Sequence, residues 1–307
     1  MSVASGKLMG SAGRIVEAGD AVRRLSVRDA QLVVTLADED EVTTPMAEIA
    51  ALVLSNPATV LTQAVIAGLA EHGGAAVLCG RNHLPAAMML PLEANVVQTE
   101  RFAAQTRMSL PLRKRLWRQI VTAKIRAQGR LLRDLHQDDA GLLAMATRVA
   151  PGDTGQLEAR AAQLYWPRLF ADPRFRRGRE GPDQNAHLNY GYAVLRALTA
   201  RALCGAGLHP SLGLRHHNRY DAFCLANDLM EPYRPLVDRA VFVWIQDRDP
   251  AAPLDKNAKA ALIAPMLADY PWQGETRSLF DWLARAASSL VGAITARARA
   301  LELPEIG

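Results

Sequence analysis

The sequence changes character near residues 91–95, and this change limits the folds that the chain can adopt. Before it, short apolar or β-branched runs alternate with charged, turn-prone segments, which is typical of β-strands. After it, apolar residues recur at the period of an α-helix and few strand signals follow. We therefore expect an α+β protein, with a small β-rich amino-terminal domain over residues 1–90 and a larger, mainly α-helical domain over residues 96–307.

The amino-terminal domain is expected to contain short strands and a single helix. Its strand candidates are apolar or β-branched runs at residues 25–27, 32–36, 49–54, 75–79 and 83–90. The helix is expected over residues 60–72, because Gly73 and Gly74 would end it. Residues 91–95, which begin with a proline, are expected to link this domain to the rest of the chain.

The carboxy-terminal domain is expected to be a series of helices. The most regular pattern places apolar residues on or near one face over residues 98–135. Further helices are expected over residues 140–150, 154–166, 185–204, 223–239, 257–267 and 279–301. Residues 241–244 fit either an extension of a helix or a short strand.

Secretion, membrane insertion and a structural zinc site are not indicated. Residues 1–7 lack the apolar core of a secretory signal, and no stretch approaches the roughly 18 consecutive apolar residues of a membrane span. Cys79, Cys204 and Cys224 stand alone, without the paired spacing of a zinc site, and so few thiols fit a reducing compartment. We therefore expect a cytoplasmic protein with no membrane contact and with buried cysteines.

Positive charge is concentrated in two segments, while the chain as a whole carries a formal charge of +5. One segment is a predicted helix that contains almost no acid, and its basic residues are Arg113, Lys114, Arg115, Arg118, Lys124, Arg126, Arg130 and Arg133. The other is a predicted loop with Arg174, Arg176, Arg177 and Arg179. Such clusters attract polyanions, and nucleic acid is the commonest one in the cytoplasm. A solvated face of mixed charge is the alternative, and the loop is the better candidate for a DNA contact.

Several familiar catalytic motifs are missing. The sequence has no Gly-x-x-x-x-Gly-Lys-Ser/Thr loop, no Gly-x-Gly-x-x-Gly after a strand, no Gly-x-Ser-x-Gly and no His-Glu-x-x-His. This argues against nucleotide hydrolysis, dinucleotide redox chemistry, the common serine hydrolases and the common zinc proteases. Acids and histidines of the helical domain remain as candidates for chemistry.

The first candidate is Glu158, near the start of a predicted helix. Asp153 is expected to cap that helix, with Gln156 as its reciprocal partner three residues later. Small and aromatic residues follow Glu158 at helical spacing, so its carboxylate could face a crevice. The alternative is a first-turn glutamate that is favoured only by the helix dipole.

The second group of candidates is two acids and two histidines. Asp228 and Glu231 are three residues apart, so a helix would place them on one face. Two acids so close repel each other unless a cation lies between them, and Arg234 could supply a simple salt bridge instead. His216 and His217 precede this helix in a loop that could fold over its acidic face. Carboxylates with one imidazole suit Mn²⁺ or Mg²⁺ better than zinc or copper.

These residues lie in sequence blocks that resemble the Cas1 family of CRISPR-associated integrases. The blocks follow the family's order, at residues 116–125, 158–166, 185–192, 207–213 and 228–238. The β-rich beginning and helical end match the family's layout. The Asn-Tyr-Gly-Tyr run and Glu231-Pro232 look most like the branch that accompanies the Cas9 effector.

The resemblance implies that Glu158, His216 and Glu231 are both the catalytic residues and the ligands of Mg²⁺ or Mn²⁺. The family pattern Gly-Ile-His-His-x-Asn is replaced here by Gly-Leu-Arg-His-His-Asn at residues 213–218. This alignment places His216 at the position of the liganding histidine, and a shift of the loop by one residue would place His217 there. The helical domain would then be the catalytic domain.

The resemblance also implies a reaction and partners. A 3′-hydroxyl DNA end would attack a phosphodiester at the edge of a CRISPR repeat, inserting a new spacer by transesterification. The implied partners are double-stranded DNA, a second copy of the chain in a homodimer, the small protein Cas2 and, as a further partner, the Cas9 effector. The role of Asp228 stays open. Two other functions fit the same residues: a divalent-metal DNA nuclease without an integration role, and a non-catalytic DNA-binding module.

Overall fold

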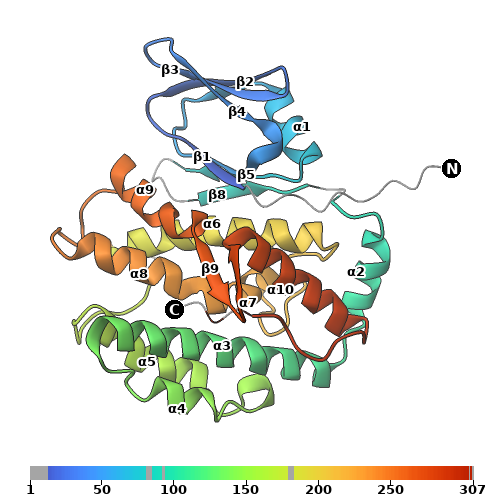
Figure 1. The fold of residues 1–307 in the computed structure, drawn as a ribbon, viewed down its shortest axis with the longest axis vertical. Helices are drawn as coiled ribbons and strands as arrows, with labels where there is room; N and C mark the ends of the chain where they lie inside the picture. The colour runs from blue at the N-terminus through green and yellow to red at the C-terminus, as the bar shows by residue number, and fades with distance from the viewer. Residues whose placement is uncertain (1–12, 81–84, 92–93, 179–182, 304, 306–307) are drawn as a thin grey trace.

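The computed structural model describes residues 13–80, 85–91, 94–178, 183–303 and 305. The β-rich part lies above a larger helical part in Figure 1. The long helix α3 runs across the lower half of the helical part, away from the β-rich part. The fold is therefore α+β with the β-rich part first, as predicted. No helix in the described part of the chain is long and apolar enough to cross a membrane.

Eight strands in the described residues build the β-rich part. They are β1 (Arg14–Ala18), β2 (Val22–Arg28), β3 (Gln31–Leu36), β4 (Glu41–Pro45), β5 (Ile49–Leu54), β6 (Val60–Leu61), β7 (Ala75–Cys79) and β8 (Pro85–Met89). One four-stranded sheet has the order β1-β5-β7-β8, and the other has the order β4-β3-β2-β6. Helix α1 (Gln63–Glu71) packs against β2 and β7. Strand β5 is parallel to both of its neighbours and is buried on both faces, which explains its uninterrupted apolar sequence.

The predicted strands at 25–27, 32–36, 49–54 and 75–79 are confirmed, but other strands escaped the sequence pattern. The sequence Glu-Val-Thr-Thr-Pro of β4 is mostly exposed and carries little apolar signal. The predicted helix at 60–72 begins only at Gln63, because Val60 and Leu61 pair with β2 and Thr62 is extended. The last predicted strand appears as β8, and residues 83–84 lie outside the described residues.

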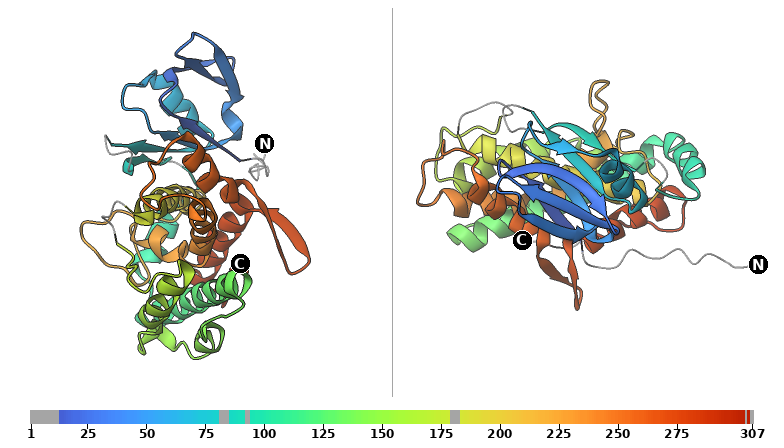
Figure 2. Two further views of the ribbon diagram at one scale, coloured as in Figure 1. Left: turned by 90° about the vertical axis from the view of Figure 1, so that its left-hand side faces the viewer. Right: turned by 90° about the horizontal axis from the view of Figure 1, so that it is seen from above.

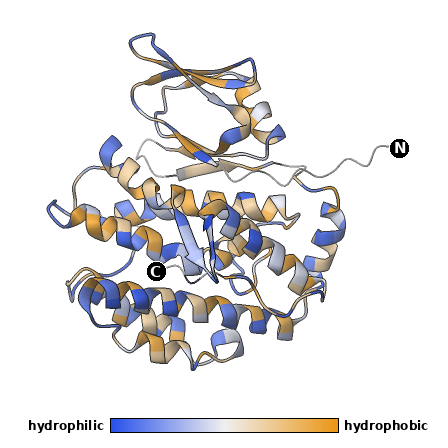
Figure 3. Cartoon of the chain, viewed as in Figure 1, coloured by the Kyte–Doolittle hydropathy of each residue, from blue (hydrophilic) through white to orange (hydrophobic). Residues whose placement is uncertain are grey.

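The second part contains nine α-helices in the described residues. They are α2 (Gln98–Thr106), α3 (Leu110–His136), α4 (Leu142–Ala146), α5 (Leu157–Leu169), α6 (Gln184–Gly205), α7 (Cys224–Leu229), α8 (Arg234–Ile245), α9 (Lys256–Ile263) and α10 (Leu279–Ile294). Helix α6 packs against α7, α8, α9 and α10 and against strands β5 and β7. Along α3, hydrophobic and hydrophilic residues alternate at helical spacing (Figure 3).

Prolines and exposed segments account for most differences from the predicted helices. The helix predicted at 98–135 is divided at residues 107–109, and Pro111 lies in the first turn of α3. The helix predicted at 223–239 is also wrong as one unit, because Pro232 leaves α7, a 3₁₀ turn (Glu231–Tyr233) and α8. Residues 241–244 are helical and belong to α8. The hairpin of β9 (Asp269–Trp272) and β10 (Glu275–Ser278) was not predicted and projects from the body (Figure 2).

The two faces of the first sheet contribute to different cores. Alternate residues of β5 point to opposite faces, so Leu52 joins a small core between the two sheets, together with Leu25 and Leu32. Ala51 and Val53 join the large core of the helical part. This shared core attaches the helices to the outer face of the sheet. The boundary between domains at residues 90–96 stays a prediction.

Candidate active site

Glu158 lies in the first turn of α5, where a preceding loop holds the helix start in place. The Asp153 carboxylate accepts hydrogen bonds from the backbone N–H of Leu157, at 2.9 Å, and of Glu158, at 3.0 Å. Asp153 therefore caps the helix, as predicted. The predicted reciprocal role of Gln156 is wrong, because this residue precedes the helix in the left-handed conformation, with φ of 52°.

Glu231 lies in the 3₁₀ turn between α7 and α8, and only 4% of its side chain is exposed. One carboxylate oxygen, Oε1, lies 3.0 Å from the Arg234 guanidinium, which realises the salt bridge that the sequence allowed. The other oxygen, Oε2, lies 2.6 Å from Lys124 Nζ. Glu231 is therefore a buried carboxylate with a cation at each oxygen.

Lys124 of α3 brings the two candidate acids together. Its ammonium nitrogen lies 2.7 Å from Glu158 Oε1 as well as 2.6 Å from Glu231 Oε2. Since both oxygens contact one nitrogen, the sum of these distances, 5.3 Å, is the largest possible separation between them. Three segments that are distant in sequence, α3, α5 and the turn after α7, thus meet at the ammonium group of Lys124. We call the group formed by Lys124, Glu158, Glu231 and Arg234 the acid cluster.

Within the acid cluster, attraction between opposite charges offsets the cost of burying them. Burial opposes ionisation of Glu231, but Arg234 and Lys124 outweigh it and hold the pKa of this carboxyl below its ordinary value. Burial likewise opposes the charge on Lys124, but Glu231 and Glu158 outweigh it and raise the pKa of the ammonium group. Glu231 and Lys124 therefore both remain charged at neutral pH.

His216 is held beside the acid cluster by Asp228. The Asp228 carboxylate is fully buried, and its Oδ1 lies 2.5 Å from His216 Nδ1. Its Oδ2 accepts the backbone N–H of Leu214, at 2.6 Å, and of Arg215, at 3.0 Å. Because an ionised carboxylate only accepts, Nδ1 carries the hydrogen and Nε2 is left for another partner. The hydrogen bond with Asp228 raises the pKa of His216, and the charges of Asp228, Glu231 and Glu158 add to it.

The expected relation between Asp228 and Glu231 is wrong. They do not share one face of a helix, because Asp228 lies in the last turn of α7, which ends at Leu229, while Glu231 begins the next turn. Asp228 faces the loop that carries His216, whereas Glu231 faces α3. The neighbouring His217 is exposed. Asp228 thus orients the histidine.

The donor set fits a hard divalent cation. Glu158 and Glu231 already gather around one positive charge, and the charges of both glutamates help to raise the pKa of His216. Two carboxylates and one imidazole are ligands that Mg²⁺ or Mn²⁺ accepts. As the side chains stand, no three His, Cys, Asp or Glu side chains of the described residues form a group ready to hold a metal. The Lys124 ammonium lies between the two glutamates instead.

Another buried carboxylate, on α8, supports this region. Asp238 accepts hydrogen bonds from the hydroxyl groups of Tyr165, at 2.7 Å, and of Tyr192. The guanidinium of Arg234 lies over the Tyr192 ring, 4.7 Å from its centroid. Burial raises the pKa of Asp238 to about 6, although both tyrosine hydroxyls and Arg234 oppose this. Helices α5, α6 and α8 are therefore joined behind the acid cluster by a polar network.

We expect Asp238→Asn to change how stability depends on pH. The pKa of Asp238 is raised from 3.8 to about 6, so between these values the folded protein keeps a proton that the unfolded chain releases. The contribution of Asp238 to the free energy of unfolding therefore decreases as pH rises through this window, by at most about 3 kcal/mol. Urea unfolding of both proteins from pH 4 to pH 7 should show the variant gaining stability relative to the wild type as pH rises. A difference that does not vary with pH would contradict this.

The basic stretch of α3 is only partly free to bind a polyanion. Arg126 and Arg130 pair with Glu305 of the C-terminal segment, and Arg133 pairs with an acid of the following loop. Lys124 belongs to the acid cluster. Half of the basic residues predicted to bind DNA on this helix are therefore paired with acids outside the helix, which its own sequence did not reveal.

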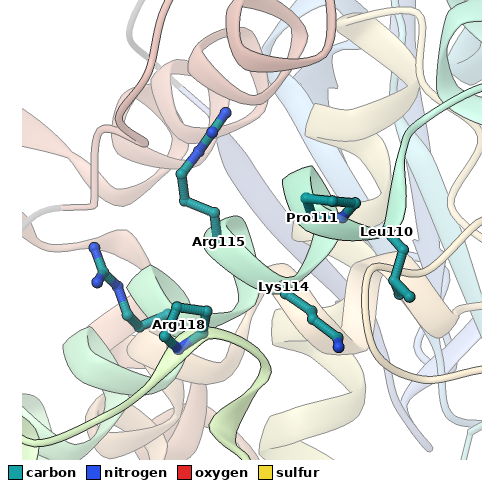
Figure 4. Close-up of a pocket in the computed structure, with 6 residues that line it drawn as sticks. Leu110, Pro111, Lys114, Arg115 and Arg118 are labelled. Carbon is teal, nitrogen blue, oxygen red and sulfur yellow. The ribbon is translucent and has the colours of Figure 1, made fainter.

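The unneutralised charge lies at the start of α3. Lys114, Arg115 and Arg118 extend from its first turns, as Figure 4 shows, and the structure gives them no ion pair with the residues it describes. They line an open pocket of about 440 Å³ together with Leu110, Pro111 and Pro151. None of Glu158, His216 and Glu231 lines it. Pro151 begins the turn that ends at Asp153, the cap of the helix that carries Glu158, so a short stretch of sequence connects the pocket to the acid cluster.

In the predicted DNA-binding loop, one arginine has a structural role. Arg177 donates to Asn185 Oδ1, at 2.9 Å, and to Asn189 Oδ1, at 2.6 Å, so it fastens the loop to α6. The side chain of Arg174 is 95% exposed. Arg179 lies outside the described residues.

Comparison with known proteins decides the family. The family model described as CRISPR associated protein Cas1 matches residues 20–252, which include every residue of the acid cluster and His216. The chain belongs to the Cas1 family. Cas1 membership confirms the resemblance seen in the sequence blocks. Cas1 proteins are named CRISPR-associated endonucleases, so the chain belongs to a family of nucleases.

One curated relative and two solved structures match almost the whole chain. The CRISPR-associated endonuclease Cas1 of Neisseria meningitidis serogroup C (strain 8013) is 35% identical over 286 residues, which is 92% of this chain and 93% of the relative. Among solved structures, a casposase bound to integration product superposes with a TM-score of 0.74 at 20% identity, covering 94% of this chain and 91% of that one. A chain of a Cas6-RT-Cas1–Cas2 complex gives 0.73 at 19% identity, covering 98% of this chain and 37% of that one. Both structures share the fold.

Proposed function

We propose that this Cas1 family member is a metal-dependent DNA integrase and endonuclease of CRISPR adaptation, which inserts new spacers into the CRISPR array. The observation that carries the proposal is the acid cluster. Two carboxylates from separate helical segments lie around one cation, in a chain whose family is named for endonuclease activity. The casposase with the same fold, which was solved with an integration product, supports integration over plain cleavage.

Glu158, His216 and Glu231 would hold the metal, Mg²⁺ or Mn²⁺. When bound, such an ion would polarise the phosphate and stabilise charge on the attacking or leaving oxygen. His216 would use Nε2, because Nδ1 is occupied by Asp228. His217 has no comparable anchor among the hydrogen bonds described, which favours His216 as the ligand.

The proposed reaction needs no nucleophile from the protein. The 3′-oxygen of a DNA end would form a new P–O bond, and the P–O bond to the 3′-oxygen of the repeat strand would break. The proton of the attacking hydroxyl would leave while the departing oxygen gains one, so one phosphodiester replaces another. The protein would bind, orient and desolvate the reacting groups, which fits a site built of buried acids and basic residues.

The proposed partners follow from this reaction. Two ends of one fragment must meet two target positions, which requires more than one active site and favours a homodimer. Cas2 is proposed as the bridging partner, since one chain of the same fold comes from a complex with Cas2. Association with the Cas9 effector and a cytoplasmic location also remain predictions from the sequence.

A strand-transfer assay tests the proposed function. The purified chain, with and without Cas2, would be given a fragment with free 3′-hydroxyl ends and a plasmid carrying a CRISPR repeat, in Mn²⁺, in Mg²⁺ and in chelator. We expect joined products only with metal and only with a 3′-hydroxyl. Cleavage without joining would favour a plain nuclease, and metal-independent DNA binding without any product would favour a binding module.

We expect the pocket on α3 to contact the DNA backbone. Replacing Lys114, Arg115 and Arg118 by alanine should weaken duplex binding for all sequences, because phosphate contacts carry little sequence information. The slope of log affinity against log salt should become less steep by up to about 0.9 for each lost contact. Fluorescence anisotropy over a range of salt concentrations would measure both effects.

Two other variants test where the DNA contact lies. Arg126→Ala with Arg130→Ala removes two charges from the same helix, against three in the triple variant. These two arginines are paired with Glu305, so the slope should change less for each charge removed. Arg174→Ala probes the loop 174–179 without disturbing the structural Arg177. An unchanged slope in the triple variant would exclude the pocket as a backbone contact.

A further inference from the structure

Lys124 occupies a position that an ordinary salt bridge would not require. Its ammonium group lies between two carboxylates, at 2.7 Å from Glu158 and 2.6 Å from Glu231, and only 12% of its side chain is exposed. Arg234 already neutralises Glu231 at the other carboxylate oxygen. One cation would have been enough to pair Glu231, yet the chain places a second one at the oxygen that faces Glu158.

The position of Lys124 Nζ also coincides with the position a divalent ion needs. A metal bound by both glutamates must lie about 2.0–2.6 Å from an oxygen of each, and the lysine nitrogen lies close to that distance from both. An ammonium group and a metal ion cannot share one point. The formal charges of Lys124, Arg234, Glu158 and Glu231 cancel as they stand, so no further cation is needed for the acid cluster to be stable.

We propose that Lys124 is a built-in counter-ion that competes with the divalent metal for Glu158 and Glu231. This rests on the proposed metal dependence and adds a role that is absent from it: the lysine holds the two ligands together in the metal-free protein and must withdraw when metal binds. The apparent affinity for metal is then reduced by the fraction of molecules in which the ammonium group lies between the acids.

Direct metal binding by Lys124 variants tests the proposal. Lys124→Met removes the charge but keeps a long apolar stem, and Lys124→Gln is a second neutral variant that still donates hydrogen bonds to the carboxylates. Lys124→Arg keeps the charge. Lys256→Met is the control, because Lys256 is an exposed lysine of α9 that belongs neither to the acid cluster nor to the pocket on α3. Free Mn²⁺ is measured by electron paramagnetic resonance in titrations of each full-length protein without DNA.

We expect the neutral variants to bind Mn²⁺ at least about tenfold more tightly than the wild type. This figure corresponds to an ammonium group that lies between the two glutamates in about nine-tenths of the metal-free molecules. Lys124→Arg and Lys256→Met should bind no more tightly than the wild type. The neutral variants should also melt at a lower temperature in chelator, because two adjacent carboxylates lose a shared cation, and should gain more from added Mn²⁺ than the wild type.

The outcomes separate this proposal from its alternatives. Lower melting temperature with unchanged Mn²⁺ affinity would show a merely structural salt bridge and overturn the proposal. Weaker Mn²⁺ binding by the neutral variants would also overturn it, since Lys124 would then assist the metal. If the wild type and every variant bind no Mn²⁺, the proposed metal dependence itself fails. If only Lys124→Gln folds well enough to be titrated, its affinity alone decides the matter.

Discussion

Glu158→Ala should abolish strand transfer while leaving DNA affinity nearly unchanged. The substitution removes a hard ligand from the proposed metal site, and the loss of several kcal/mol of charge stabilisation corresponds to about a thousandfold or more in rate. It removes no phosphate contact, because a carboxylate does not bind phosphate. Strand-transfer products would be measured on gels and duplex affinity by fluorescence anisotropy, both with the full-length protein.

The matched control is Glu100→Ala, which removes an exposed glutamate from the first turn of another helix, α2. Both substitutions lose a favourable first-turn charge. Glu158→Ala also removes one of the two carboxylate partners of Lys124, so it should lose more stability than the control. Only the Glu158 variant should lose activity. If both variants transfer strands normally, the alternative of a glutamate favoured only by the helix dipole would be correct. A folded Glu158 variant that no longer binds DNA would contradict the separation of binding from catalysis.

The sequence was sufficient for the fold class because its hydrophobic periods differ so clearly before and after residue 90. A continuous apolar run predicted β5, and the helical period predicted α3 and α6. Strands such as β4 and β9 were missed because short exposed strands carry little apolar signal, although each pairs with a neighbouring strand in a hairpin. Helix boundaries were missed where prolines interrupt the backbone hydrogen bonds without interrupting the apolar pattern.

In the candidate site, the sequence named individual residues but did not show which side chains contact each other. Glu158 and Glu231 were named from motif order, but nothing local to either one shows that they face the same lysine. Lys124 was assigned to a DNA-binding surface with its basic neighbours, although its spacing from Ile120 and Val121 puts it on the buried face of α3. A lysine on an apolar face requires a buried anion, and this signal could have found it. Asp228 was misplaced because the helix was assumed to continue through Pro232.

Asp228→Asn should reduce strand transfer about as strongly as the loss of His216 itself. Asparagine keeps the size of the side chain, and its carbonyl oxygen can still accept the backbone N–H of Leu214 and Arg215. Its amide group, however, would donate to His216 Nδ1, where the aspartate accepts. The ring would then have to carry its hydrogen on Nε2, which could no longer bind a metal.

We expect an activity loss of at least about 100-fold for Asp228→Asn, at the upper end of what changes in the hydrogen-bond partners of metal ligands produce. Nitrogen chemical shifts of His216 in the metal-free protein provide a readout that does not depend on catalysis: the neutral ring should carry its hydrogen on Nδ1 in the wild type and on Nε2 in the variant. Asp221→Asn is the matched control, because Asp221 accepts from Phe223 and Asn227 in the same loop without contacting a histidine. If the Asp228 variant keeps the wild-type tautomer and activity, Asp228 serves the loop backbone alone, and the orientation of His216 must come from its edge-on contact with Trp117.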